Sequence, residues 1–401
     1  MTAFLILALG LVRADQRRKV GFRLTAIGLG VLAATAVGES ACWFWPAETM
    51  PGNPWLTVTR DQTDRRTRQL VFERKPHLHW KGLSVGCLAV ENGHDDPYAC
   101  EVEFQTDHEG FRNSEDLTKA DIIFLGDSHT EAGYLAEEKT FSARVGRKIN
   151  LAARNLGRIN HCPSEELVIL EAYGLPCRPK FVVWQICEHN DLLDEVLYRT
   201  WLDAQMPEIQ SPNSIRGEVW RSRSPTFRLF DFLRSRQQWP WQGEFTDADG
   251  KKHPMLFVGP LTRNHRPQAS SGFPLLAQSL QKGVGLSREE KHSFQLVVLL
   301  IPEKLRVMGH FVKFSKETSK RLGPRWDLAH DQTIGFYLAK LCDQWQVPFV
   351  DMTGPLKKLA ANGEMVYLPY ETHLSDAGHA LVADHLVEIL SQSDGEPASI
   401  Q

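Results

Sequence analysis

The chain has 401 residues, of which 42% are hydrophobic and 24% charged, and its formal net charge is −3. This length suffices for one large domain or two modest ones, and the composition is that of an ordinary globular protein. A charge so close to zero gives no sign of a nucleic-acid partner. The 7 cysteines form no CxxC pairs and have no histidines at zinc-binding spacing, which disfavours a structural metal site.

The N-terminal region, residues 1–45, has the pattern of a membrane anchor. Residues 2–12 are apolar, but they are fewer than the roughly 20 residues that a transmembrane helix needs. A basic cluster follows, then an uncharged run over 24–38 and an aromatic group at 43–45. Because basic flanks stay in the cytoplasm, this order predicts that the rest of the chain lies on the extracytoplasmic side.

Three interpretations of this region remain. We favour a single anchor over about residues 20–45, with residues 2–12 forming an imperfect second helix. A signal peptide cleaved near residues 34–36 is the second, although the long basic stretch before the apolar run counts against it. The third is a buried helix of a soluble protein.

Residues 46–120 are polar and contain many prolines, glycines and short alternating runs such as RQLVFERK. We interpret them as a strand-rich segment that leads into the main domain, and we call them the lead-in segment. Cys87 and Cys100 are close enough in the sequence to share one hairpin, so in an exported protein they are the first pair to consider for a disulfide. Free, half-buried thiols are the alternative that we favour.

The pattern changes at residue 121, where short apolar runs begin to alternate with helical stretches. This alternation predicts a parallel sheet covered on both faces, a doubly wound α/β fold with its site at the carboxyl ends of the strands. The predicted strands lie within residues 121–127, 149–156, 181–187, 294–302 and 347–352. The predicted helices cover 138–148, 163–174, 331–345 and 376–391, and the last begins at Ser375 or Asp376, which are both good caps.

The main domain therefore covers residues 121–392, and 393–401 resemble a frayed tail. The interval from about 195 to 290 is too long for a plain crossover and is rich in Arg, Trp, Pro and Phe. We expect an insertion there, partly helical, that forms a cap over the site. Trp220, Trp239 and Trp241 in this insertion are candidates for stacking on sugar rings, with core packing as the alternative.

Ser128 is the first candidate for chemistry. It follows the apolar run IIFLG and precedes a helical stretch, so it is expected at the carboxyl edge of the sheet near a helix N-terminus. That position suits a nucleophile whose attack creates an oxyanion. The alternative is that Asp127 and Ser128 only cap the helix.

His373 is the candidate base among the 15 histidines. It lies in the loop between the last predicted strand and the last helix, and in a doubly wound sheet this loop reaches the carboxyl end of the first strand. Glu371 is placed to orient its imidazole, unless it is a solvated loop carboxylate. His129, His161 and His189 flank the proposed site, where supporting or surface roles are expected.

The candidate oxyanion donors follow the second and third strands. Asn190 ends the third strand and has two amide hydrogens to donate, unless it forms an Asx turn that starts the next helix. The loop NLGRINHCPSEEL after the second strand offers a backbone N–H group as a further donor.

These residues resemble the four blocks of the SGNH (GDSL-type) hydrolase family: Ser128 in GDSHT, the NLGRINHCPSEEL loop, Asn190 in HND, and His373 in ETHLSDAGH. Order and spacing both match, over roughly residues 105–392. The stretches DHEGFRN and LLIPEKLRV also resemble a bacterial membrane-anchored subgroup, whose members often act on acylated cell-surface polysaccharides.

The resemblance implies a flavodoxin-like three-layer α/β/α fold and a Ser–His–acid mechanism without a metal or cofactor. It also implies an oxyanion hole formed by the Ser128 backbone, the second-block residue and the Asn190 side chain. Two departures stand out. Asn160 replaces the oxyanion glycine, although a backbone donor can come from any residue and Asn tolerates a positive φ. Glu371 replaces the usual Asp, and its extra methylene is expected to displace the carboxylate and weaken the triad.

The sequence thus predicts an esterase or O-acyltransferase that acts on acyl esters of an extracellular or envelope glycan. Both activities share an acyl-Ser128 intermediate, so the sequence does not separate them. The rival is a catalytically silent, membrane-tethered glycan-binding or assembly protein on the same fold. Asn160 and Glu371 favour the rival, whereas Ser128, Asn190 and His373 favour the enzyme.

Overall fold

The computed structural model describes residues 60–61, 69–71, 73–92, 95–203, 241–258, 270–322 and 333–392, with most positions from 23 to 37. The chain forms two compact units, Met1–Met50 with Gln210–Gln238, and Pro51–Ile209 with Trp239–Gln401. In the first unit the described positions between 23 and 37 are helical, and the remainder of the predicted anchor lies outside the described residues. No helix among the described residues is long and apolar enough to cross a membrane.

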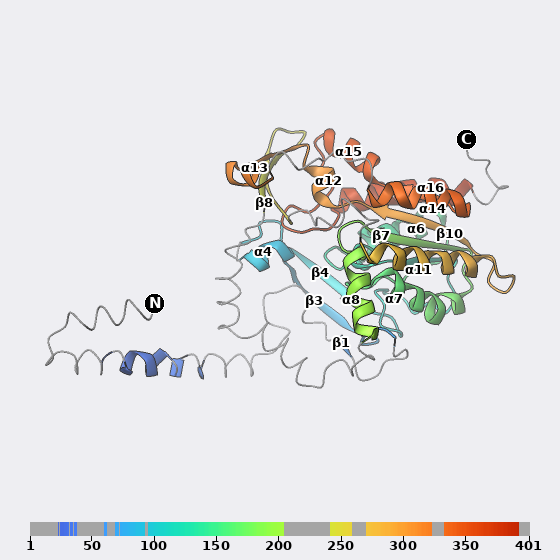
Figure 1. Ribbon diagram of the computed structural model, residues 1–401, viewed down its shortest axis with the longest axis horizontal. Helices are drawn as coiled ribbons and strands as arrows, with labels where there is room; N and C mark the ends of the chain where they lie inside the picture. The colour runs from blue at the N-terminus through green and yellow to red at the C-terminus, as the bar shows by residue number, and fades with distance from the viewer. Residues whose placement is uncertain are drawn as a thin grey trace. The chain divides into compact units, whose positions relative to one another are not determined.

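A five-stranded parallel sheet forms the centre of the second unit (Figure 1). Its strands are β5 (Ile122–Leu125), β6 (Ala153–Asn155), β7 (Phe181–Cys187), β10 (Gln295–Ile301) and β12 (Phe349–Asp351). Their order across the sheet is β6-β5-β7-β10-β12, with every neighbouring pair parallel. This is the flavodoxin-like order, and it places a switch point at the carboxyl ends of β5 and β7, where ligands bind in such folds. The predicted doubly wound sheet is confirmed.

Helices cover both faces of the sheet and make the three layers. On one face lie α6 (Phe141–Ile149), α15 (Thr353–Ala361) and α16 (Asp376–Gln392), and on the other α7 (Pro163–Ile169), α11 (Gly272–Ser287) and α14 (Ile334–Trp345). Successive strand residues serve opposite faces, so that Phe124 joins the first core and Leu125 the second. Both layers of side chains must be apolar, which explains why these strands are continuous apolar runs.

The predicted helices match the structure except at their ends, and the last one shows why it begins where it does. The Ser375 Oγ accepts a hydrogen bond from the Gly378 N–H at 3.2 Å, and the Ser375 carbonyl accepts one from His379 N–H at 2.9 Å. Ser375 is therefore the cap of α16. This cap fixes the chain two residues after His373.

The interval 195–290 contains parts of both the core and a small second sheet. Helix α8 (Asp191–Asp203) follows β7 and packs against α11, which lies in the main layer structure. Strands β8 (Trp241–Thr246), β9 (Lys252–Phe257) and β11 (Val312–Phe314) form an antiparallel sheet. Trp241 is half-buried against the core, whereas Trp220 and Trp239 lie outside the described residues. The cap over the site remains a prediction.

The lead-in segment is folded onto the sheet domain. Its described elements are β1 (Arg60–Asp61), β2 (Glu73–Arg74), β3 (His79–Ser84), α4 (Cys87–Asn92) and β4 (Cys100–Gln105), with β3 antiparallel to β4. All described cysteines are free thiols, including Cys87 and Cys100, so the considered disulfide is not formed. The remaining short elements are α5 (Ser128–Glu131), η2 (Glu137–Lys139), η3 (Leu170–Gly174), η4 (Leu175–Cys177), α12 (Lys304–Met308) and α13 (Lys316–Leu322).

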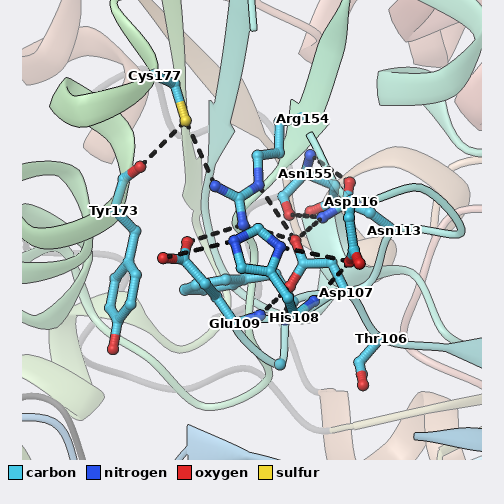
Figure 2. A network of polar contacts seen from close by, with 12 residues as sticks. Thr106, Asp107, His108, Glu109, Asn113, Asp116, Arg154, Asn155, Tyr173 and Cys177 are labelled. Carbon is cyan, nitrogen blue, oxygen red and sulfur yellow. Dashed lines mark hydrogen bonds and ion pairs between the residues drawn. The ribbon is translucent and has the colours of Figure 1, made fainter. Parts of the chain in front are cut away.

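A buried polar network joins the lead-in segment to the end of β6 (Figure 2). Arg154 donates to the Asp107 carboxylate from Nη2 at 2.7 Å and from Nε at 3.1 Å, and its Nη2 also donates to Glu109 at 2.8 Å. Asn113 accepts the Asn155 N–H at 2.9 Å and donates to the Asn155 carbonyl at 3.0 Å. The stretch DHEGFRN therefore forms the clamp on this strand end.

The network continues to helix α5, which carries Ser128. The Asn155 side chain donates to the carbonyl of Thr130, in α5, at 2.7 Å, and accepts the Gly157 N–H at 2.9 Å. One asparagine thus links the helix that carries Ser128 to the loop that carries Asn160. The lead-in clamp and the site loops form one bonded unit.

Replacing Arg154 with methionine should lower the free energy of unfolding by about 3 kcal/mol, because it leaves the buried Asp107 carboxylate without its cation. Chemical denaturation measures this loss. The matched control is Lys180→Met, which removes a surface ion pair with Asp121 (3.0 Å, lysine side chain 63% exposed) and should cost well under 1 kcal/mol. Equal losses in the two variants would contradict the role of the clamp.

Candidate active site

The turn after β5 exposes Ser128 at the carboxyl edge of the sheet. Gly126 has φ +151°, and a Cβ there would lie 2.4 Å from Gln185 Oε1, so the position requires glycine. Asp127 then caps α5 by accepting the His129 N–H at 3.0 Å. Ser128 is the first residue of that short helix, where backbone N–H groups have no partner within the helix.

Buried charged side chains of the lead-in segment contact helix α5. Glu131 forms an ion pair with Arg74, both side chains being 1% exposed, and it also accepts the Ile159 N–H at 3.1 Å. Arg112 donates to the carbonyl of Glu131 at 3.0 Å and to that of Ala132. Movement of the turn that carries Ser128 would therefore break buried polar contacts, which are costly to leave unmade.

Ser128, His373 and Glu371 form a hydrogen-bonded chain. The Ser128 Oγ lies 2.7 Å from His373 Nε2, and His373 Nδ1 lies 2.9 Å from Glu371 Oε1. A carboxylate accepts only, so Nδ1 carries the proton and Nε2 presents its lone pair to the serine hydroxyl. The structure therefore brings the three predicted residues together in the arrangement of a nucleophile, a base and an orienting acid.

Two aromatic side chains contact the imidazole ring of His373. The Tyr134 ring stacks on His373 with centroids 4.5 Å apart and an interplanar angle of 23°. His129 meets the same ring edge-on at 4.9 Å, and burial lowers the pKa of His129 well below its ordinary range, so it is neutral. An electron-rich phenol against a developing imidazolium is favourable.

Glu371 is 2% exposed and yet ionised. Burial alone raises its pKa, but the charge of His373 and hydrogen bonds from His373 and Cys87 outweigh burial and hold the pKa at about 2. Cys87 donates its backbone N–H to Oε2 and its thiol to Oε1, both at 2.7 Å. The Thr372 N–H adds a bond at 2.8 Å.

Lys304 ties down the loop that carries Glu371. Its ammonium contacts four backbone carbonyls, those of Leu256, Leu368, Pro369 and Glu371, at 2.7 to 3.0 Å. Burial lowers the pKa of Lys304 to about 7, and the Glu371 carboxylate opposes this. The carbonyls come from β9 and from the segment before His373, so Lys304 joins the second sheet to the base.

A cavity of about 400 Å³ opens onto the triad and is lined by Ser128, His373, Asn160 and Asn190. Asn190 donates one amide hydrogen to Asp194 at 2.6 Å, which orients the amide and leaves its second hydrogen for a ligand. Asn160 adopts φ 59°, the left-handed conformation that its residue type tolerates. The predicted oxyanion residues thus lie around one space.

The other flanking histidines divide between the cavity and the core. His129 and His189 line the cavity, and His189 lies 4.0 Å from the Glu303 carboxylate. His161 is fully buried and lies 3.7 Å from Glu165. Within the described part of the chain, no cluster of three or more His, Cys, Asp or Glu side chains is arranged to hold a metal ion.

The sequence analysis did not connect three residues with the triad that they contact: Cys87, Tyr134 and Lys304. Cys87 and Glu371 are 284 positions apart, so no local pattern connects them. Lys304 lies within the stretch LLIPEKLRV, and the resemblance of this stretch to a protein subgroup could have marked Lys304 as a candidate. Tyr134 is six residues beyond the nucleophile, and its position gives no chemical indication of stacking on the base.

No family profile matches the chain, and a search of curated proteins found no match. Among solved structures, a two-domain esterase active on acetylated mannans matches 70% of this chain at 14% identity with a TM-score of 0.36, and the match covers 51% of that esterase. An acetylxylan esterase from Geobacillus stearothermophilus, Axe2, matches 68% of this chain and 95% of its own length at 12% identity, with a TM-score of 0.35.

A further acetyl xylan esterase, AlAXEase, matches 67% of this chain and 98% of its own length at 13% identity, with a TM-score of 0.35. All three of these proteins are esterases. At such low identities and TM-scores, however, the similarities say nothing about what this chain binds or hydrolyses. Only the residues of the site bear on the question of substrate.

Glu371→Gln should remove a pH-dependent part of the stability. Because the folded pKa of Glu371 (about 2) lies below its ordinary value of 4.5, the ionised group stabilises the folded protein by about 3 kcal/mol above pH 4.5. That stabilisation disappears as the pH falls through 2. The difference in unfolding free energy between the native protein and Glu371→Gln should therefore shrink from pH 6 to pH 2.

The control is Glu364→Gln, at an exposed position of the same loop region, which accounts for the general effect of removing a negative charge. A difference that is constant with pH for Glu371→Gln would show that folding does not lower the pKa of this carboxyl.

Proposed function

We propose that this chain is a serine-dependent esterase of the SGNH type, with Ser128 as nucleophile, His373 as base and Glu371 as the acid that orients it. The observation that carries the proposal is the bonded chain from Ser128 Oγ through His373 to Glu371, at 2.7 Å and 2.9 Å, at the wall of a cavity. A serine activated by an oriented imidazole is the arrangement that acyl transfer needs.

The reaction proceeds in two halves. His373 Nε2 takes the Ser128 proton as Oγ attacks the acyl carbonyl, and the proton then passes to the leaving alcohol oxygen. Glu371 keeps the proton on Nδ1 and stabilises the imidazolium between these transfers. Water, activated by the same imidazole, then attacks the acyl-serine and releases the carboxylic acid, which frees Ser128.

The oxyanion is stabilised by the donors around the cavity. The backbone N–H groups of Ser128 and Asn160 and the free amide hydrogen of Asn190 are the three donors of this proposal. Each is fixed before the substrate arrives, Asn190 by Asp194 and the Asn160 loop by Glu131. Donors that need no reorganisation contribute most to the rate, and losing one costs on the order of 10²-fold or more.

The substrate is an acylated sugar of a polysaccharide or envelope glycan. The support is the wall beyond the triad, where His189, Asp194 and Glu303 line the cavity with polar groups suited to sugar hydroxyls. Val90 and Phe257 line it as well and add an apolar surface that suits a small acyl group. A sugar hydroxyl in place of water as acceptor gives O-acyl transfer by the same intermediate.

The alternative is a catalytically silent glycan-binding protein. Binding a glycan does not require an ionised carboxylate buried behind a histidine. Burying such a charge is costly unless it is paired and hydrogen-bonded. The bonds to Glu371 are the feature that an enzyme needs and a binding protein does not, so they favour the enzyme.

A fluorophosphonate probe should label this chain on Ser128, because the activated Oγ attacks phosphorus and expels fluoride. Peptide mass spectrometry locates the adduct, and 4-nitrophenyl acetate hydrolysis gives the rate. Ser128→Ala should abolish both, and His373→Ala should slow both by about 10⁶-fold. Ser114→Ala, an exposed serine, is the control. Labelling elsewhere, or hydrolysis that survives Ser128→Ala, would overturn the proposal.

We also propose that residues 1–45 anchor the protein in a membrane with the sheet domain on the extracytoplasmic side. The support is the order of basic cluster, apolar run and aromatic group in the sequence. This location agrees with a substrate on the cell surface.

A pair of reporters fused after residue 401 tests the orientation. A phosphatase that folds only outside the cytoplasm should be active, because the basic cluster retains the N-terminal flank inside. A fluorescent protein that folds only in the cytoplasm should stay dark. The opposite pattern would reject the proposed orientation.

A further inference from the structure

Helix α4 of the lead-in segment reaches the acid of the triad. Cys87, its first residue, donates two hydrogen bonds to Glu371, one from the backbone N–H to Oε2 and one from the thiol to Oε1, both at 2.7 Å. The thiol thus contacts the same oxygen that accepts His373 Nδ1–H at 2.9 Å. Cys87 is half-buried and lines the active-site cavity.

We propose that Cys87 is a positioning residue of the active site, whose thiol and backbone N–H hold the Glu371 carboxylate in the plane and rotation that His373 requires. This inference rests on the proposed function. A glutamate side chain has one more rotatable bond than an aspartate, and its carboxylate is fixed only if both oxygens are bonded. The backbone bond fixes Oε2, and the thiol fixes Oε1 against His373.

The geometry separates this role from that of other neighbours. Thr372 also donates its N–H to Oε1, at 2.8 Å, but it belongs to the same loop as Glu371 and moves with it. Cys87 comes from a separate element, whereas Lys304 contacts the backbone carbonyl of Glu371, at 3.0 Å. Cys87 is thus the contact that ties the acid's side chain to the lead-in segment.

The first test compares Cys87→Ala with Cys87→Ser in the full chain. Alanine removes the side-chain donor and should lower kcat for 4-nitrophenyl acetate about tenfold with KM within twofold, since the loss of one hydrogen bond to a charged group has this order of effect. Serine retains a donor and should stay within about threefold of the native kcat. Cys100→Ser, an exposed cysteine of the same segment, should change neither constant.

Three results would overturn the proposal. One is a native kcat in Cys87→Ala. Another is an equal fall in the alanine and serine variants, which assigns the effect to packing. The last is a rise in KM alone, which makes Cys87 a substrate contact. Thermal melting of each variant identifies any that fails to fold.

Modification of the thiol gives an independent arm. In methyl methanethiosulfonate treatment the Cys87 thiolate attacks the reagent sulfur, forms a methyl disulfide and expels methanesulfinate. The native protein and Cys100→Ser should lose activity and recover it with dithiothreitol, whereas Cys87→Ser should be resistant. Inactivation of Cys87→Ser at the native rate would contradict the proposal.

A stability measurement, which does not depend on catalysis, distinguishes this inference from the proposed function. The titratable groups around Glu371 are Cys87, His373, Lys304 and Tyr134, and Cys87→Ala changes the first alone. With one donor fewer, Glu371 should protonate at a higher pH, so Cys87→Ala should lose stability at a higher pH than the native protein during acid titration. An unchanged acid profile would refute the contact even in a chain that hydrolyses no ester.

Discussion

The site depends on keeping one buried carboxylate charged. An isolated ionised carboxylate in a protein interior takes up a proton rather than remain unpaired. Glu371 escapes this because Cys87, Thr372 and His373 supply donors to both of its oxygens. An ionised Glu371 has acceptors only, so it accepts the hydrogen bond from His373 Nδ1–H, and Nε2 then faces Ser128 with a lone pair. The proposed activation of Ser128 therefore depends on the contacts made to Glu371, behind His373.

The lead-in segment is part of the active site as much as the sheet domain is. Arg74 and Arg112 hold the helix of Ser128, Asp107 and Asn113 hold the strand end that leads to Asn160, and Cys87 contacts Glu371. Buried charges of this kind are costly to break but add little net stability compared with an apolar core. Their value here is positional, since they specify one arrangement of three loops that come from different strands.

The sequence was sufficient for the five strands of the sheet and for four of the helices that cover it, and the physical reason is burial. Helices α11 and α15 were not predicted. Strands covered on both faces are continuous apolar runs, and the runs at 121–127 and 181–187 contain β5 and β7. The small sheet of β8, β9 and β11 was missed because WQGEFT and KHPMLF include a glycine and a proline and show no clear alternation.

The same limit applies within the site. Ser128 and Asn190 were recognisable because each follows a strand that the apolar pattern reveals, and His373 because it lies just before the last helix. The partners of the acid were not, because a contact between Cys87 and Glu371 depends on how α4 lies across the sheet edge. Periodicity describes which face of an element is buried, and it does not describe which distant element meets it.

Glu371 illustrates how context changes the meaning of a substitution. The extra methylene of Glu371, taken alone, predicts a carboxylate with more conformational freedom that orients His373 poorly. Fixing a long side chain costs about 1–2 kcal/mol of conformational entropy, and that cost is met when the protein folds. In this structure the donors from Cys87 and Thr372 restrict the side chain before any substrate binds. The longer acid still lies 2.9 Å from His373 Nδ1, and one of the contacts that hold it comes from a helix in another part of the chain.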